Sequence, residues 1–312
     1  MWNIYNLWEN KDISKERLLE LSRKINIRPD IIERLIALYD TSYQIMKADI
    51  QQIYIGGSMI NQVYIDPSEA RLSIHIHTAI REGIKSKNEL IDVFINLRER
   101  MIKDKSIISL NIGDLEVYIG EIISDTKRQS LHPKVLFLNR SIPSFFIGTP
   151  LPNYLNKLGF TTNNTDVNKF LMRIKRELGY MPKIYNIRIE IRFDKDGINY
   201  PYIKRRVYPY FKDDLIPTKV FTCNIEEVSS AAKGKIEFLE IVDKYQTINI
   251  INTICDLRIL YLYDLKIKIS EDIINKIEKI KDRCQEDFEK YWFYKLISTK
   301  YSFYDIFRAI MK

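Results

Sequence analysis

The 312-residue sequence has few of the features that mark disulfide-stabilised, zinc-ribbon or membrane-spanning proteins. Its three cysteines, Cys223, Cys255 and Cys284, lie far apart in the chain, and no Cys-x-x-Cys pair occurs. A disulfide framework and a cysteine-based structural zinc are therefore not expected, and we expect buried thiols. No apolar run reaches the roughly 18 residues that a bilayer crossing needs. The first residues, MWNIYNLWENKD, lack the basic-then-apolar pattern of a signal peptide, so we expect a cytoplasmic protein with no membrane partner.

Positive charge is only modestly in excess. Lys and Arg number 49 against 41 Asp and Glu, which gives a formal net charge of +8. This balance favours a polyanionic partner such as RNA, DNA or a nucleotide, but the basic residues are spread along the chain, so such a partner stays an open question. Hydrophobic residues make up 46% and charged residues 29%, which is typical of a globular protein and excludes a disordered one.

Hydrophobic periodicity predicts helices and strands on the same chain, and we expect an α+β protein. Ser14 is expected to cap the first helix and Pro29 to begin the second. The alternating stretch 184–194 carries the strongest strand signal in the chain. The expected domains are an N-terminal helical segment 1–50, an α/β domain 51–214 and a helical C-terminal domain 215–312. The expected elements are helices over 14–48, 86–104, 166–180 and beyond 225, strands near 53–55, 71–77, 107–112, 115–123, 134–139 and 184–194, an extended segment 200–211, and a loop with a little helix over 140–163.

A Gly-Gly-Ser turn follows the first predicted strand. Gly56 and Gly57 allow the backbone to approach a ligand closely, and Ser58 can donate a hydrogen bond to a phosphate oxygen at the start of a short helix. The alternative is a tight strand-to-helix turn with no ligand, which two glycines also supply.

The next predicted strand, RLSIHIH, places Arg71, Ser73, His75 and His77 on one face. Two imidazoles side by side are typical of a metal site. They also fit ordinary polar residues of a strand, and both interpretations stay open on spacing alone.

The order of these features resembles the nucleotidyltransferase superfamily, in particular its AbiEii/AbiGii toxin-like branch. The features are the helical lead-in, the IGGS turn and the strand Arg71-x-Ser73-x-His75-x-His77. The resemblance covers residues 14–80 well and the remaining residues loosely. It implies a nucleotidyltransferase-like α+β fold with a mixed β-sheet and flanking helices, an N-terminal helical segment and a helical C-terminal region. It also implies transfer of a nucleotide from a nucleoside triphosphate to RNA or protein, and a divalent metal in the active protein. It also implies phosphate contacts from Gly56, Gly57, Ser58, Arg71 and Ser73, and a cognate antitoxin as partner.

The sequence departs from that family at the metal ligands, because His75 and His77 stand where the family has two aspartates. The third carboxylate of the family matches Glu190, whose alternative role is an ion pair with Arg188 or Arg192. Two histidines and a carboxylate suit zinc, iron, nickel or manganese better than magnesium, which prefers oxygen ligands. His75, His77 and Glu190 are therefore the candidate metal ligands and catalytic positions.

The resemblance also assigns Lys233 a contact with the triphosphate, whereas its spacing alone favours a solvated helix face. A second candidate surface is the extended segment 200–211, where Tyr200, Tyr202, Lys204, Arg206 and Tyr208 would share one face. Tyrosines beside two cations can stack bases and neutralise phosphates. The alternative is an edge hairpin whose tyrosines pack at its margin.

These features lead to one functional hypothesis and three alternatives. The first is a divergent AbiEii-like protein of toxin–antitoxin type that binds nucleotide or RNA and has weak or lost magnesium-dependent transfer. The alternatives are an active nucleotidyltransferase with an altered metal site and a non-catalytic interaction protein. The third is a metal-dependent phosphoesterase of the PHP class, because His75-x-His77-Thr78 resembles its first metal motif.

Overall fold

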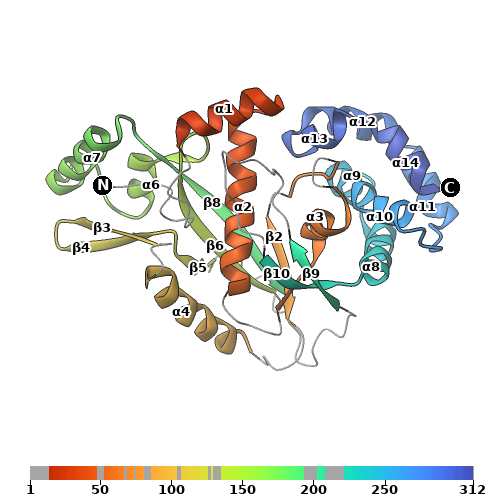
Figure 1. Ribbon diagram of the computed structural model, residues 1–312, viewed down its shortest axis with the longest axis horizontal. Coiled ribbons are helices and arrows are strands. Elements are labelled where there is room, and N and C mark those ends of the chain that lie inside the picture. The colour runs from red at the N-terminus through yellow and green to blue at the C-terminus, as the bar shows by residue number, and fades with distance from the viewer. Residues whose placement is uncertain are drawn as a thin grey trace. The chain divides into compact units, whose positions relative to one another are not determined.

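The computed structural model describes residues 14–47, 53–66, 69–73, 75–80, 86–103, 107–125, 128, 135–192, 202–207 and 221–311. Mixed strand pairing and helices on the same chain confirm the expected α+β class (Figure 1). Within the described residues, no helix is both long and apolar enough to cross a membrane. The chain divides into two compact units, a first made of Met1–Gln51, Ile84–Lys195 and Lys212–Thr218, and a second made of Gln52–Gly83, Asp196–Phe211 and Lys219–Lys312.

The first unit is built on antiparallel strands. Strand β6 pairs along its whole length with β8, β5 pairs with the other side of β6, and β7 pairs with one end of β8. A separate hairpin joins β3 to β4. Its elements are α1 (Lys15–Ile25), α2 (Pro29–Lys47), α4 (Lys87–Lys103), β3 (Ile108–Ile112), β4 (Leu115–Ile119), β5 (Ile122–Ser124), β6 (Val135–Ser144), β7 (Thr149–Pro150), α6 (Leu151–Lys157), α7 (Thr165–Leu178) and β8 (Lys183–Arg192).

Several local predictions for the first unit are confirmed. The hydroxyl of Ser14 accepts a hydrogen bond from the backbone N–H of Arg17 at 3.2 Å, as an N-cap does, and Pro29 begins α2. In β8, the alternate residues Ile187, Ile189 and Ile191 are fully buried, as the two-residue period predicts.

Two predictions for this unit are wrong. The expected strand 115–123 is two strands, because Gly120 has a left-handed backbone with φ 99° and ends the first one. The expected loop 140–163 begins as strand, since β6 continues to Ser144 through Pro143, which lies opposite Ile184 of β8. Proline lacks only the donor of a ladder hydrogen bond, so its carbonyl and the following residue can still pair.

Helix α2 lies against β6 in the first unit (Figure 1), and buried charged side chains join the two elements. The guanidinium of fully buried Arg140 donates to the Asp40 carboxylate at 2.7 Å, to the Thr41 hydroxyl at 3.1 Å and to the Gly120 carbonyl at 2.9 Å. Two turns earlier on the helix, the Glu33 carboxylate accepts hydrogen bonds from the chain immediately after β6, including the backbone N–H of Phe145 at 2.7 Å. Buried charges need such partners, and here the partners fix the helix against the strand.

The second unit has a small mixed sheet with the order β2–β1–β10–β9. Strand β1 runs parallel to β10 and antiparallel to β2, and β10 pairs antiparallel with β9. Its elements are β1 (Ile53–Ile55), the 3₁₀ helix η2 (Gly57–Ile60), α3 (Asn61–Tyr64), β2 (Ile76–Ile80), β9 (Tyr202–Val207), β10 (Phe221–Glu226), α8 (Val228–Ile241), α9 (Thr247–Asp256), α10 (Arg258–Leu262), α11 (Glu271–Glu278), α12 (Lys281–Lys290), η3 (Trp292–Tyr294), α13 (Lys295–Ser298) and α14 (Phe303–Met311).

The C-terminal helices of the second unit pack around aromatic side chains. Phe288 and Tyr294 stack with ring centroids 5.1 Å apart, and Phe303 and Phe307 stack at 6.1 Å. All four are buried. The thiols of Cys255 and Cys284 are also buried and free, as the sequence predicts, whereas the side chain of Cys223 lies outside the description.

A buried ion cluster connects these helices to the chain before β2. The carboxylate of Asp256, at the end of α9, accepts two hydrogen bonds from Arg71, at 2.6 and 2.9 Å, and a third from Lys235 of α8 at 2.6 Å. Burial alone would raise the pKa of Asp256, but the charges of Arg71 and Lys235 hold this pKa below its ordinary value. The cluster therefore stabilises the fold above the ordinary pKa of aspartate, and this stabilisation is lost as the pH falls through the lowered value.

The strand expected at 71–77 begins only at Ile76, so that part of the prediction is wrong. Strand β1 is short and pairs only with Thr78, Ala79 and Ile80, so the residues before Ile76 have no partner in β1. They are held by other bonds instead: the backbone N–H of Leu72 donates to the Phe293 carbonyl at 2.7 Å, and the side chain of Arg71 binds Asp256.

Replacing one cation of this cluster tests its contribution to stability. Lys235→Met should lower the free energy of unfolding by about 1–2 kcal/mol, because a charged hydrogen bond to the buried Asp256 is lost while Arg71 stays in place. Lys233→Met is the matched control, since Lys233 is exposed on the same helix. This substitution should change the free energy of unfolding by less than about 0.5 kcal/mol. Urea unfolding followed by circular dichroism measures both. Equal effects of the two substitutions would contradict a special role for Lys235.

Candidate functional site

The Gly-Gly turn and the histidine strand meet inside the second unit. The backbone N–H of Gly56 donates to the carbonyl of His77 at 3.1 Å. Gly57 has a left-handed backbone with φ 61°, and a Cβ at this position would lie only 2.8 Å from Cβ of His77. Gly57 is therefore needed partly because the side chain of His77 occupies the space beside it. The two motifs that the sequence analysis joined are in direct contact.

The turn leads into a short helix. The 3₁₀ helix η2 has four residues and α3 has four more, so few peptide dipoles align toward the turn. The backbone of Ser58 lies in η2, and its side chain lies outside the description. A phosphate contact by Gly56, Gly57 and Ser58 stays a prediction.

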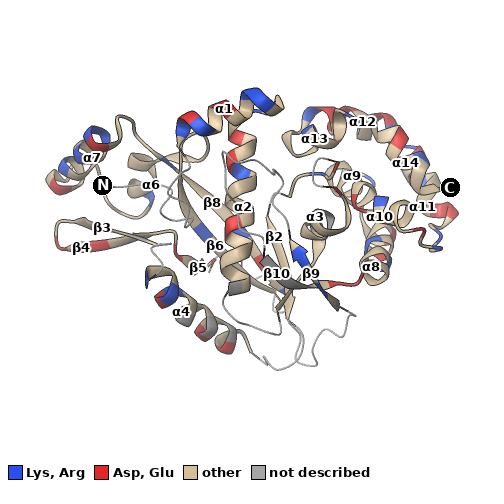
Figure 2. Ribbon diagram, viewed as in Figure 1, with Lys and Arg blue, Asp and Glu red and all other residues tan. Residues whose placement is uncertain are grey.

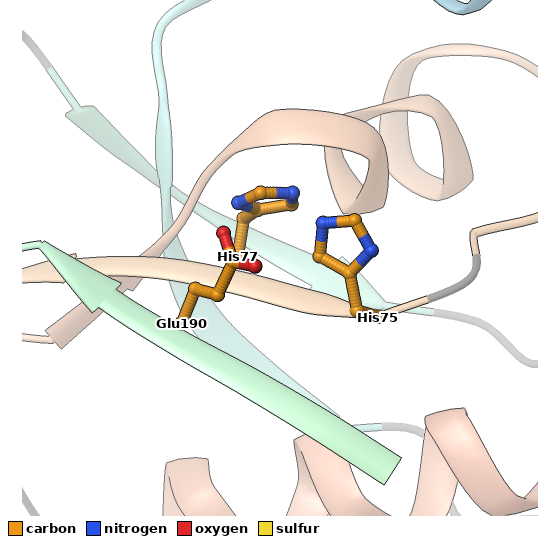
Figure 3. A group of neighbouring side chains, drawn as sticks. All are labelled: His75, His77 and Glu190. Carbon is orange, nitrogen blue, oxygen red and sulfur yellow. The ribbon is translucent and has the colours of Figure 1, made fainter. Parts of the chain in front are cut away.

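His75 and His77 lie next to one another, His75 immediately before β2 and His77 within it (Figure 3). Their ring centroids are 4.0 Å apart, and the ring planes are tilted by 58°. Both side chains are half-buried, whereas the residues between and after them, Ile76 and Thr78, are buried on the opposite face. The alternation expected from the sequence is therefore present from His75 onward. Two adjacent imidazoles offer nitrogen donors, which suit late transition metals and not magnesium.

Glu190 belongs to the first unit, where it lies opposite Phe137 in the pairing of β8 with β6. Its carboxylate is half-buried, and Oε1 lies 2.9 Å from Nε of Arg188 on the same strand. The ion pair with Arg188, which the sequence analysis offered as the alternative role, is therefore present. Figure 3 shows the Glu190 side chain, which projects from β8. Its role as a metal ligand stays a prediction.

Arg71 and Ser73 make hydrogen bonds to other groups of the protein. Arg71 is 6% exposed and is held by Asp256 and by the carbonyl of Asn252 at 3.2 Å. Ser73 is fully buried, and its hydroxyl donates to the carbonyl of His75. These bonds position the residues that lead into the histidine strand. A phosphate contact by either residue stays a prediction.

The two lysines of α8 have different environments. Lys233, the predicted triphosphate contact, is exposed, whereas Lys235 reaches the buried Asp256. The sequence analysis missed Lys235, although helical spacing carries the signal. Lys235 lies three residues after Ala232 and four before Leu239, so it falls on the buried side of the helix.

Glu226 is a further acidic residue near the turn that the sequence analysis did not choose. It ends β10, the parallel neighbour of β1, and a Cβ at Gly56 would lie 3.8 Å from its Oε2. The hydroxyl of Ser230 donates to its Oε1 at 3.2 Å. The parallel pairing of β1 with β10 would have pointed to this carboxylate, but the sequence alone does not reveal that pairing.

The proposed nucleic-acid face is described in part. Lys204 and Arg206 are both exposed on β9, the edge strand of the small sheet, and Figure 2 shows basic residues there. They lie opposite Asn224 and Thr222 of β10, so two cations share one side of the strand, as expected. Tyr200 and Tyr208 lie outside the described residues, and only the backbone of Tyr202 is described.

Comparison with known proteins gives a limited result. No family model matches the chain, and no curated protein matches it. The crystal structure of JHP933 from Helicobacter pylori matches with a TM-score of 0.44 and 11% identity, over 89% of this chain and 89% of that one. A second H. pylori structure, provisionally assigned as a nucleotidyltransferase, matches with a TM-score of 0.40 and 11% identity, over 96% of this chain and 93% of that one. At TM-scores below 0.5 neither likeness assigns a function, and the α+β class rests on the strands and helices of the chain itself.

Proposed function

We propose that the protein is a divergent nucleotidyltransferase-fold protein of toxin–antitoxin type, which binds nucleotide or RNA and has weak or no magnesium-dependent nucleotidyl transfer. The observation that carries this proposal is the pair of touching imidazoles, His75 and His77, beside the Gly-Gly turn. These are the two positions at which the resemblance to the AbiEii branch implies aspartates. The cognate antitoxin follows from that resemblance alone.

The residues present do not fit the magnesium ion that an intact relative would use. Mg²⁺ demands oxygen ligands in a nearly octahedral arrangement at about 2.0–2.1 Å and gives up its waters reluctantly. Imidazoles at both positions remove two negative charges and replace hard oxygen donors with nitrogen. The contact of His77 with Gly57 also fills space beside the turn that a phosphate would approach. Both effects favour loss of the transfer reaction.

Binding of a nucleotide or RNA needs no such metal. Lys204 and Arg206 are exposed on one side of an edge strand, where they can neutralise phosphates, and Lys233 is exposed on α8. In this account the backbone N–H of Gly56 contributes little, because it already donates to His77. Binding should therefore be mainly electrostatic and only weakly selective for sequence.

A second candidate function is transfer with an altered metal, which the two adjacent imidazoles favour because they can hold a softer ion. A purely non-catalytic interaction protein would bind neither nucleotide nor RNA, so a binding titration separates it from both. We do not propose a PHP-class phosphoesterase, because that site needs more histidines than the three in the chain.

Restoring the carboxylates tests the catalytic part of the proposal. With labelled nucleoside triphosphate, bulk RNA and Mg²⁺, the wild-type protein should give little labelled product. The double variant His75→Asp, His77→Asp should raise the rate by at least about 100-fold if the scaffold is otherwise intact, since a correctly bound metal supplies several kcal/mol. His75→Ala, His77→Ala is the control, because it removes the imidazoles without adding carboxylates, and it should stay inactive. Efficient labelling by the wild-type protein with Mg²⁺ would sink the proposal of lost transfer.

Removing two cations tests the binding surface. Lys204→Met, Arg206→Met should weaken binding of single-stranded RNA and reduce the slope of log affinity against log salt by about 2. Lys266→Met, Lys268→Met is the matched control, because it removes two exposed cations of the same unit at the same spacing. Fluorescence anisotropy at several salt concentrations measures both slopes. An equal loss in the two variants would show that net charge, and not the face of β9, drives binding.

A further inference from the structure

We infer that Glu226 binds the ribose hydroxyls of a nucleotide or of an RNA strand, so that the protein distinguishes RNA from DNA. The inference rests on the proposed function, because it names the class of nucleic acid that the second unit binds. All the residues that carry it belong to that unit. It involves no metal and no transfer reaction.

The carboxylate of Glu226 lies beside the Gly-Gly turn, where two parallel strands end. Strands β1 and β10 run parallel with Ile55 opposite Ile225, so the next residues of the two strands, Gly56 and Glu226, are neighbours. A Cβ at Gly56 would lie 3.8 Å from Oε2 of Glu226. Ligands of open sheets often bind beyond the carboxyl ends of neighbouring parallel strands. The carboxylate therefore lies at a position in the sheet that suits a ligand.

Hydrogen bonds fix Glu226 at this position. The hydroxyl of Tyr64 donates to its backbone carbonyl at 2.9 Å, and the hydroxyl of Ser230 donates to Oε1 at 3.2 Å. The residue is half-buried, so it is held by the fold and still reaches solvent. The two oxygens of a carboxylate offer about four sites that accept hydrogen bonds. A group held in this way loses little conformational entropy when a ligand binds.

A carboxylate beside the turn favours hydroxyl groups over phosphates. It accepts hydrogen bonds and donates none, and its negative charge repels a phosphate. Ribose offers the 2′-hydroxyl in an RNA strand, and also the 3′-hydroxyl in a free nucleotide. An acidic side chain accepts the ribose hydroxyl in dinucleotide-binding folds as well. Deoxyribose lacks the 2′-hydroxyl, which is the group by which a protein distinguishes RNA from DNA.

The same face of the small sheet carries cations that can hold the adjoining phosphates. Glu226 lies opposite Tyr202 in the pairing of β10 with β9. Lys204 and Arg206 follow Tyr202 by two and four residues, so they lie on the same face as Glu226. Lys204 is about 7 Å along β9 from Tyr202, and both cations are exposed. A strand whose ribose contacts Glu226 can therefore place its phosphates on Lys204 and Arg206.

Fluorescence anisotropy of labelled single-stranded oligonucleotides of one sequence tests the inference on the full chain. At a fixed salt concentration the protein should bind RNA about tenfold more tightly than DNA, which is the effect of one hydrogen bond to a charged group. RNA with 2′-fluorine in place of the 2′-hydroxyl should bind as weakly as DNA, because fluorine cannot donate a hydrogen bond. Equal affinities for RNA and 2′-fluoro RNA would overturn the inference.

Replacing Glu226 tests which residue makes the contact. Glu226→Ala should bring the ratio of RNA affinity to DNA affinity close to one, because the acceptor of the 2′-hydroxyl is lost. Glu226→Gln keeps the volume of the side chain and should lower this ratio at least about threefold, since a neutral amide accepts a weaker hydrogen bond than a carboxylate. Circular dichroism establishes that each variant is folded, and the glutamine variant decides the matter if the alanine variant is not.

Glu227→Ala is the matched control. It removes the same charge from the next residue, whose side chain makes no cap hydrogen bond to α8. It should change the affinities for RNA and DNA alike and leave their ratio unchanged. An equal fall of the ratio in Glu226→Ala and Glu227→Ala would contradict a specific contact by Glu226.

The outcomes separate this inference from the proposed function. Tight and equal binding of RNA and DNA would agree with the proposed function and overturn the ribose contact. A preference for RNA that persists in Glu226→Ala would also agree with the proposed function, and it would overturn the assignment to Glu226. Binding of neither oligonucleotide would contradict both.

Discussion

The buried carboxylate of Asp256 is the constraint on which the geometry of the histidine strand depends. A carboxylate inside a protein must be paired, and Asp256 is paired with Arg71 and Lys235, which come from different parts of the second unit. Strand β1 is too short to hold the chain before β2, so the bond to Arg71 does so. The same bond that satisfies a buried charge thus holds the segment that leads into the histidine strand.

A second constraint acts on the other side of the strand. Gly57 leaves room for the His77 side chain, and Gly56 binds the His77 carbonyl, so the turn and the strand are mutually fitted. The two glycines therefore have a structural role, in addition to any contact that they make with a ligand. The imidazole of His77 occupies the space next to the turn, so a ligand that approached Gly57 would compete with this ring.

Local patterns in the sequence predicted the features that depend on neighbours in the chain. The alternating isoleucines of β8, the Ser14 cap and the start of α2 at Pro29 are all of this kind. Features set by distant contacts were missed. The strand expected from Arg71 starts at Ile76, and the residues before it are held by bonds to Asp256 and to the Phe293 carbonyl. For the site, the adjacency of the Gly-Gly turn and the histidines was anticipated, whereas Lys235 and Glu226 were not, since their positions follow from the packing of α8 and the parallel pairing of β10.

The central proposal is that the donor pair His75 and His77 does not suit magnesium and can hold only a softer metal. Crystals grown with both Zn²⁺ and Mg²⁺, with diffraction data collected on either side of the zinc absorption edge, test it most directly. The account predicts an anomalous peak within bonding distance of one ring nitrogen of His75 and one of His77. An absence of anomalous signal at these rings, or a magnesium ion with its waters in the same place, would contradict it.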